Sequence, residues 1–248
     1  MVVDIMKFFD KIFDIQDNES YCVSGLNNEL VCINICNAFI KNNKGFLVVA
    51  SSTFEANNLY QSLLNYTNRV LFFPMDDFLT SEAIAISPEF KAERINTLNM
   101  LLKSGKYIVV TNLMGALRYL PSKNLWRKSN ITLKKGNDIN REKLLNDLYN
   151  IGYERETIVN GTGKIGVRGY VIDIFPISYE NAVRIEFWGD TFDSIKYFDV
   201  DTQLSLEEID EVTIYPFTEF LLDEYSEDIE KKQKYLEYYS DTVSMISE

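Results

Sequence analysis

Hydrophobic positions in the first 120 residues follow two alternating patterns. Continuous apolar runs such as GFLVVA (45–50) and YIVVT (107–111) are typical of strands covered on both faces in a parallel sheet. Between these runs, apolar residues recur three or four positions apart, which predicts helices. The predicted strands are 21–24, 45–50, 70–73 and 107–111, and the predicted helices are 5–15, 28–41, 53–65, 89–103 and a short one ending near residue 119. This alternation predicts an α/β domain with a parallel sheet and helices on both faces.

The pattern changes near residue 130. A strand and then a helix are predicted first, and short strands with alternating apolar and polar residues follow, separated by tight turns. These elements form an α+β domain with an antiparallel meander; their ranges are 131–134, 140–151, 157–159, 165–175, 183–188 and 192–200. We therefore expect two domains, residues 1–129 and 130–219. Residues 220–248 are strongly acidic with helical propensity, and we expect them to begin a helical connector to a third region of a longer protein.

Composition narrows the possible functions. The 248 residues include no histidine, which excludes His-dependent triads and His metal sites. The formal net charge of −12 argues against a surface that coats nucleic acid everywhere. No apolar run approaches the roughly 20 residues of a membrane span. Acids interrupt the first residues, where a secretory signal would lie. The three cysteines suit a reducing compartment. We therefore expect a cytoplasmic protein that does not contact membranes.

The predicted strand–turn–helix at 21–42 is where a phosphate-binding P-loop would lie. Gly25 fits the first glycine of that motif. However, Leu30 stands at the second glycine, Val31 at the lysine and Cys32 at the Ser/Thr that would hold magnesium. Because the loop lacks its main phosphate ligand, we expect a structural turn with no nucleotide or other cofactor.

Cys32 and Cys36 are four positions apart and share one face of the predicted helix. A structural zinc needs about four ligands, and the remaining Cys22 cannot complete such a set without histidine. We expect thiols of the hydrophobic core and no metal.

Residues 103–143 carry 10 bases and only 2 acids, with Tyr119 and Trp126 nearby. Interleaved bases and aromatics could contact a nucleic-acid backbone. A solvated face, or an internal partner for the acidic remainder of the chain, is the interpretation we favour. The bases of the segment include Lys123, Arg127, Lys128, Lys134, Lys135, Arg141 and Lys143.

The predicted strand RIEFW (184–188) places a large indole on a charged face. Side chains alternate along a strand, so Arg184, Glu186 and Trp188 lie opposite Ile185 and Phe187.

By the same alternation Arg168 and Tyr170 share a face, opposite Val167. Exposed Arg and Trp are typical of protein–protein hot spots. A cation–π or stem-packing patch with no partner fits equally well, and the pattern alone leaves both readings open.

Residues 153–216 resemble a known family. VRGYVIDIFP (167–176) followed by VRIEFWGDTFDSIKYFDVDTQ (183–203) is similar to the second domain shared by the excision-repair protein UvrB and the transcription-repair coupling factors, the Mfd family. The stretches FFPMDDFLTSEAIAISPEFKAERINTL (72–98) and YIVVTNLMGALRYLP (107–121) resemble the first, helicase-like domain of the coupling factors. The resemblance covers nearly the whole chain, except its start and its acidic end.

Two departures separate the chain from UvrB itself. UvrB-like proteins have an intact P-loop, and they carry a long aromatic hairpin for probing damaged DNA. Here the link from Pro74 to Arg94 is too short for that hairpin. The resemblance therefore implies the amino-terminal, UvrB-like region of a coupling factor, with a vestigial RecA-like first domain.

The resemblance also implies a function. In the family this region mimics UvrB to recruit UvrA during transcription-coupled nucleotide excision repair, and the UvrA-contacting positions fall on Arg168, Arg184 and Trp188. The aromatic is Trp here rather than Phe. We expect an acidic patch on UvrA as the complement, no ATPase or translocase activity in this chain, and RNA polymerase and DNA bound only through domains outside it. The alternatives are a direct DNA-binding module and a UvrB-type, ATP-dependent damage-loading protein.

Overall fold

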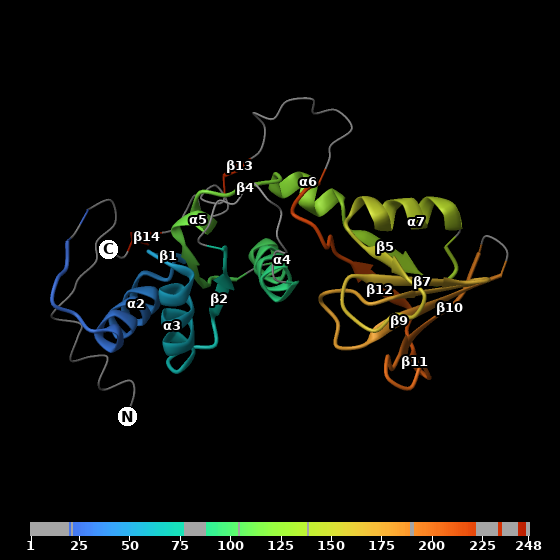
Figure 1. The fold of residues 1–248 in the computed structure, drawn as a ribbon, viewed down its shortest axis with the longest axis horizontal. Helices are drawn as coiled ribbons and strands as arrows, with labels where there is room; N and C mark the ends of the chain where they lie inside the picture. The colour runs from blue at the N-terminus through green and yellow to red at the C-terminus, as the bar shows by residue number, and fades with distance from the viewer. Residues whose placement is uncertain are drawn as a thin grey trace. The chain divides into compact units, whose positions relative to one another are not determined.

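The structure is a computed structural model that describes residues 20, 22–76, 88–103, 105–137, 139–188, 191–221, 233–234 and 243–246. The chain forms two compact units, each with its own sheet (Figure 1). The first contains Met1–Tyr119 and Gln233–Glu248, and the second contains Leu120–Lys232. The predicted mixture of α and β structure, with one parallel and one antiparallel sheet, is confirmed.

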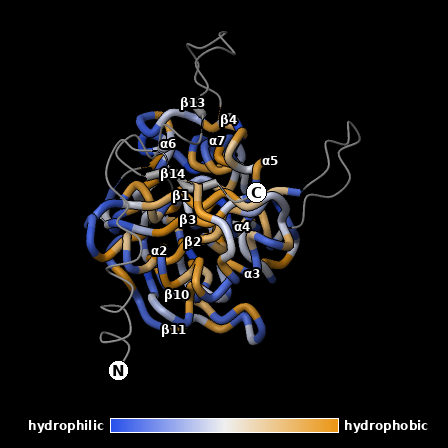
Figure 2. Tube along the Cα trace, turned by 90° about the vertical axis from the view of Figure 1, so that its left-hand side faces the viewer, coloured by the Kyte–Doolittle hydropathy of each residue, from blue (hydrophilic) through white to orange (hydrophobic). Residues whose placement is uncertain are grey.

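The first unit is built on a parallel sheet with the strand order β14-β1-β3-β2. The strands β1 and β3 are buried along their whole length, as their apolar runs predict. Figure 2 shows these strands as hydrophobic stretches of the tube. In chain order the elements are α2 (Asn28–Asn42), β1 (Phe46–Ala50), α3 (Thr53–Leu64), β2 (Val70–Phe73), α4 (Pro88–Leu102), β3 (Ile108–Asn112), α5 (Leu113–Ala116) and β14 (Val243–Ile246). The predicted strands and helices between residues 28 and 116 are confirmed to within a few residues.

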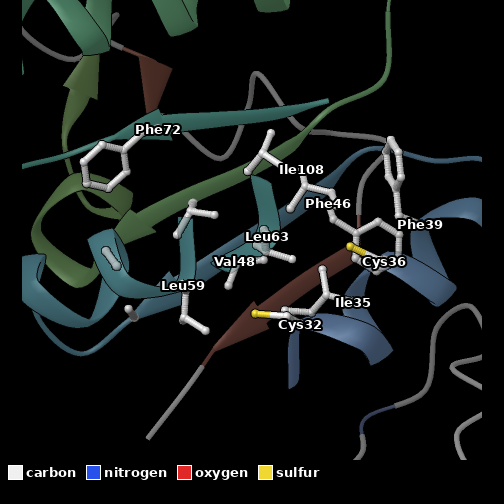
Figure 3. Close-up of a cluster of buried hydrophobic side chains, with 14 of the residues drawn as sticks. Cys32, Ile35, Cys36, Phe39, Phe46, Val48, Leu59, Leu63, Phe72 and Ile108 are labelled. Atoms are coloured by element: carbon white, nitrogen blue, oxygen red, sulfur yellow. The ribbon is translucent and has the colours of Figure 1, made fainter. Parts of the chain in front are cut away.

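Local sequence fixes where these helices begin. The side chain of Asn27 accepts a hydrogen bond from the backbone N–H of Leu30, and Ser52 does the same for Glu55. Each cap satisfies one of the backbone donors that a helix leaves open at its start. The helices then cover the sheet through a shared core, to which α2 contributes Cys32, Ile35 and Cys36 (Figure 3).

The second unit holds a six-stranded sheet with the order β11-β10-β9-β8-β7-β6, antiparallel except where β6 runs parallel to β7. A separate antiparallel pair joins β12 to β5. The helix α7 packs Leu144 and Leu148 into the same core as the sheet. The elements are β4 (Tyr119–Leu120), α6 (Lys123–Lys128), β5 (Ile131–Lys134), α7 (Arg141–Asn150), β6 (Glu154–Glu156), β7 (Lys164–Arg168), β8 (Val171–Ile174), β9 (Ala182–Trp188), β10 (Thr191–Phe198), β11 (Ser205–Glu208) and β12 (Glu211–Ile214).

Four of the predicted elements differ from the structure or lie outside its described residues. The strand expected at 157–159 is wrong, because the chain pairs three residues earlier, as β6. The single strand expected at 165–175 is two strands, β7 and β8, joined by a turn at Gly169 with a φ of 56°. The described part of 21–24 is not a strand. The predicted helix 5–15 lies outside the described residues.

The acidic segment also differs from expectation where it is described. Residues 233–234 form β13 (Gln233–Lys234), and residues 243–246 form β14, so helix is the wrong prediction at these positions. β14 adds to the parallel sheet beside β1, with Phe46 opposite Val243. Sheet pairing here overrides a local helical propensity.

Candidate protein-interaction site

The strand β9 separates its side chains as the sequence predicts. Ile185 and Phe187 are buried in the core of the second unit. Arg184 and Glu186 are half-buried on the opposite face, and the Trp188 side chain is 84% exposed. An exposed tryptophan beside an arginine combines two residue types that are enriched in protein–protein hot spots.

The turn between β7 and β8 brings a second aromatic to the same end of the sheet. Arg168 lies opposite Val171 at the end of the ladder, and Tyr170 follows in the turn, 68% exposed. The backbone N–H of Phe187 donates to the Tyr170 carbonyl (2.9 Å), so Tyr170 lies beside the end of β9 that carries Trp188. The predicted alternation of Arg168 and Tyr170 along one strand is wrong, because the chain turns between them.

Asp173 joins the two predicted arginines. It lies on β8, directly opposite Arg184, and its side chain is only 2% exposed. Arg184 donates to both carboxylate oxygens, from Nε (2.7 Å) and from Nη2 (3.0 Å). Arg168 donates from Nη2 to the same carboxylate (2.6 Å). Sequence reasoning missed Asp173, although a single acid inside the apolar run VIDI (171–174) is a signal for a buried ion pair.

A turn after β10 completes this cluster. Gln203 has a φ of 62°, and its carbonyl accepts a hydrogen bond from Nη1 of Arg184 (3.1 Å). Its side chain accepts from Arg168 (3.3 Å) and donates to the carbonyl of Val200 (2.8 Å). The turn is held by Asp199, which accepts from the N–H and hydroxyl of Thr202. These hydrogen bonds hold the pKa of Asp199 below its usual range.

The remaining charges on this face are paired. Glu186 accepts from Lys196 (2.7 Å) and from the hydroxyl of Ser194 (2.6 Å), and these bonds lower its pKa. The Arg184 guanidinium lies 4.6 Å from the ring centre of Phe198, a cation–π distance. Its hydrogen bonds to Asp173 raise the pKa of Arg184 above the usual value. The two arginines and Lys196 balance Asp173, Glu186 and Asp199, and Arg168, with half of its side chain exposed, is the most exposed of these cations.

The other candidate sites of the sequence are elsewhere. In the turn at 25–32, Gly25 has a φ of 81°, Leu30 and Val31 lie in the first turns of α2, and Cys32 is fully buried. Burial raises the pKa of Cys32 to about 11 and of Cys36 to about 12, so both stay neutral thiols. Their assignment to the core is confirmed. Within the described ranges, no three metal-ligating side chains lie together.

The basic segment keeps Trp126, one of its two predicted stacking aromatics, away from solvent. Trp126 is fully buried, so it is not available for stacking on a base. Lys135 forms an ion pair with Glu208. This contact agrees with the interpretation that bases of the segment pair with acids of the same chain. Arg127 and Lys128 are exposed at the end of α6. None of the described helices is long and apolar enough to cross a membrane.

Comparison with known proteins finds a family that resembles most of the second unit. The model of the family described as the UvrB interaction domain matches residues 131–220, which include Arg168, Asp173, Arg184 and Trp188. Residues 131–220 are therefore similar to the UvrB interaction domain. The resemblance that the sequence predicts is therefore confirmed.

Matches to curated proteins extend the similarity beyond residues 131–220, to most of the chain. The chain is 33% identical, over 218 residues, to a transcription-repair-coupling factor of Staphylococcus haemolyticus, covering 87% of this chain and 19% of that relative. It is 32% identical to the same factor of Staphylococcus epidermidis, covering 86% of this chain and 18% of the relative. For a Staphylococcus aureus factor the identity is 33%, and the coverage is 82% and 17%. The chain thus spans about a fifth of the length of the curated relatives it matches.

Proposed function

We propose that this chain recruits UvrA in transcription-coupled nucleotide excision repair, by presenting the surface around Arg168, Arg184 and Trp188. The observation that carries the proposal is the exposed Trp188 ring at one end of a sheet face that also holds two arginines sharing one acid. An aromatic anchor next to an arginine with half of its side chain exposed suits an acidic patch with an apolar pocket on the partner. The family match over this surface supports UvrA as that partner.

Within the surface the three residues contribute differently. Trp188 is the anchor, because burying an exposed indole removes a large apolar area from water. Arg168 is half exposed and offers donors to a partner carboxylate. The Arg184 side chain is 14% exposed, and each of its three nitrogens already donates a hydrogen bond. Arg184 therefore contributes the second N–H of Nη2 and the electrostatic field of its positive charge.

We also propose that the first unit is a vestigial helicase-like (RecA-like) domain without a nucleotide site. The parallel sheet with flanking helices and the sequence Leu30-Val31-Cys32 in place of the phosphate ligands support this. In this proposal residues 1–129 correspond to domain 1a of UvrB, residues 130–219 to its domain 2, and residues 220–248 to the start of a connector. The chain is then a cytoplasmic recognition module with no enzymatic activity, and RNA polymerase and DNA are bound by other parts of the coupling factor.

Binding of the chain to purified UvrA, measured by calorimetry, tests the recruiting function. The variant Arg168→Ala/Trp188→Ala should lose at least about tenfold in affinity, because truncating hot-spot residues costs this much or more. The matched control is Phe54→Ala/Arg127→Ala, which removes an exposed aromatic and an exposed base elsewhere. The control should bind within about twofold of wild type.

Two results would contradict the proposal. One is a folded wild-type chain that does not bind UvrA, and the other is equal binding by the Arg168→Ala/Trp188→Ala variant. The alternatives predict different behaviour: measurable ATP binding would favour a UvrB-type protein. DNA binding with a steep salt dependence that is lost in Arg127→Gln/Lys128→Gln would favour a DNA-binding module.

A further inference from the structure

Asp173 is the least exposed charged residue of the interaction surface and the one that touches both arginines. The Asp173 carboxylate is a buried charge, and leaving it unpaired would be costly. Two permanently charged arginines pair with it and offset that cost. The geometry is bidentate toward Arg184 and single toward Arg168. The two contacts are therefore not equivalent.

Arg184 is held on every nitrogen. Nε and Nη2 donate to Asp173, and Nη1 donates to the Gln203 carbonyl (3.1 Å) and to the Ser205 hydroxyl (3.5 Å). Its guanidinium also lies over the ring of Phe198. Releasing Arg184 would break four hydrogen bonds at once and leave the buried carboxylate without its main partner.

Arg168 is held by one nitrogen only. Nη2 donates to Asp173 and to the Gln203 side chain, while Nε and Nη1 make no hydrogen bond to any residue that the structure describes. Half of its side chain is exposed, against 14% for Arg184. If Arg168 turns away, Asp173 keeps both bonds to Arg184 and stays neutralised.

The neighbouring strand leaves room for this arrangement. Gly166 lies opposite Asp173 in the β7–β8 ladder, and a Cβ atom there would come within 3.2 Å of Val159 and 3.8 Å of Asp173. A side chain at this position would therefore crowd Val159, while its contact with the Cβ of Asp173 would be an ordinary one.

We propose that Asp173 is the positioning residue of the recognition surface: it fixes Arg184 in place and holds Arg168 in a bond that Arg168 exchanges for a carboxylate of the acidic partner. This inference rests on the proposed function for the identity of that partner. The exchange keeps the number of charge pairs constant, because Arg168 gains the partner's acid as it leaves Asp173 and Asp173 retains Arg184. Binding then needs no new buried charge on this side of the interface.

Asp173→Asn tests the inference, because it keeps the shape of the side chain and removes its charge. Affinity for purified UvrA should fall at least about tenfold. The loss should persist in an Arg168→Ala chain, because Asp173 still has to hold Arg184 there. It should shrink to less than about threefold in an Arg184→Ala chain, since Asp173 and Arg184 act through one contact. Glu208→Gln is the matched control, an acid of the same sheet that pairs only with Lys135 among the contacts described for it, and it should bind as wild type does.

A second measurement separates this inference from the proposed function. The Nε–H proton of Arg184 should exchange slowly with water in NMR spectra of the chain alone, and that of Arg168 quickly, with the slow signal lost in Asp173→Asn. If the chain does not bind UvrA yet shows this difference, the proposed partner is wrong and the positioning by Asp173 stands. Equal exchange for the two arginines, or undiminished UvrA binding by a folded Asp173→Asn chain, would overturn the inference.

Discussion

Gly163 lies directly against the ring of Phe217. A Cβ atom at position 163 would come within 2.1 Å of that ring. The φ of Gly163 is 81°, a backbone angle that residues other than glycine rarely adopt. The contact connects the turn before β7 to the segment after β12, which also donates a backbone hydrogen bond from Phe217 to Ile151 (2.7 Å). Close packing at this glycine is therefore part of how the second unit closes its core.

Gly163→Ala should destabilise the second unit by about 2 kcal/mol or more, because it adds both a clash and a strained backbone. Urea unfolding followed by tryptophan fluorescence measures this. Gly161→Ala is the control: its Cβ would meet nothing within 4 Å, and we expect a change below about 1 kcal/mol. Equal stability of the two variants would show that the ring of Phe217 moves aside without cost.

Asn112 should be the most sensitive polar position of the first unit. Its Nδ2 donates to the Thr53 hydroxyl (2.9 Å) and the Met75 carbonyl (2.7 Å), and its Oδ1 caps α5 at the N–H of Gly115 (3.1 Å). Asn112→Ala removes the cap from the buried N–H of Gly115, while the Thr53 hydroxyl still donates to the Met75 carbonyl. The change should cost about 1–3 kcal/mol of unfolding free energy.

Chemical denaturation of Asn112→Ala beside Asn57→Ala tests this expectation. Asn57 is exposed on α3, where alanine is a good helix former, so its change should stay within about 0.5 kcal/mol. A small effect at both positions would contradict the importance of the network.

The buried thiols predict a loss of stability at alkaline pH. Burial raises the pKa of Cys32 to about 11 and of Cys36 to about 12, from an ordinary value of 9.0. The folded state therefore holds these protons more tightly than the unfolded state, so their contribution is complete below pH 9 and declines as pH rises from 9 towards 11. The decline should be weaker in Cys32→Ala/Cys36→Ala. A thiol reagent should modify the exposed Cys22 quickly and the other two only on unfolding; three equally fast thiols would contradict the buried assignment.

Tyr170 should contribute to the recognition surface beside Trp188. It is exposed, and its carbonyl bonds to the backbone next to that tryptophan. We expect Tyr170→Ala to weaken binding to UvrA about threefold to thirtyfold, measured by calorimetry with Phe54→Ala as control. Unchanged affinity would confine the anchor to Trp188.

Much of the fold follows from the sequence because its signals are local. The apolar runs that become β1, β2 and β3 are long enough to need burial on both faces, and Asn27 and Ser52 mark helix starts. The errors lie where pairing is decided by distant residues. β6 is parallel to β7 and β14 joins β1 from the far end of the chain, and neither leaves a periodic signal of its own.

The site shows the same division. Alternation along β9 places Arg184 and Trp188 on the polar face, as observed. It cannot show that Gln203, 19 residues further on, closes over Arg184 with a left-handed turn, or that Asp173 binds both arginines. Whether the three predicted residues contact UvrA stays a prediction.

The pairing of β14 with β1 has a consequence for the order in which the chain is made. Phe46 and its partner Val243 are separated by the whole of the second unit, so the ribosome completes that unit before it supplies the edge strand of the first. Until then β1 has one free edge, which is open to pairing with other chains. The second unit can fold early, while the sheet of the first unit is completed only when residues 243–246 are made.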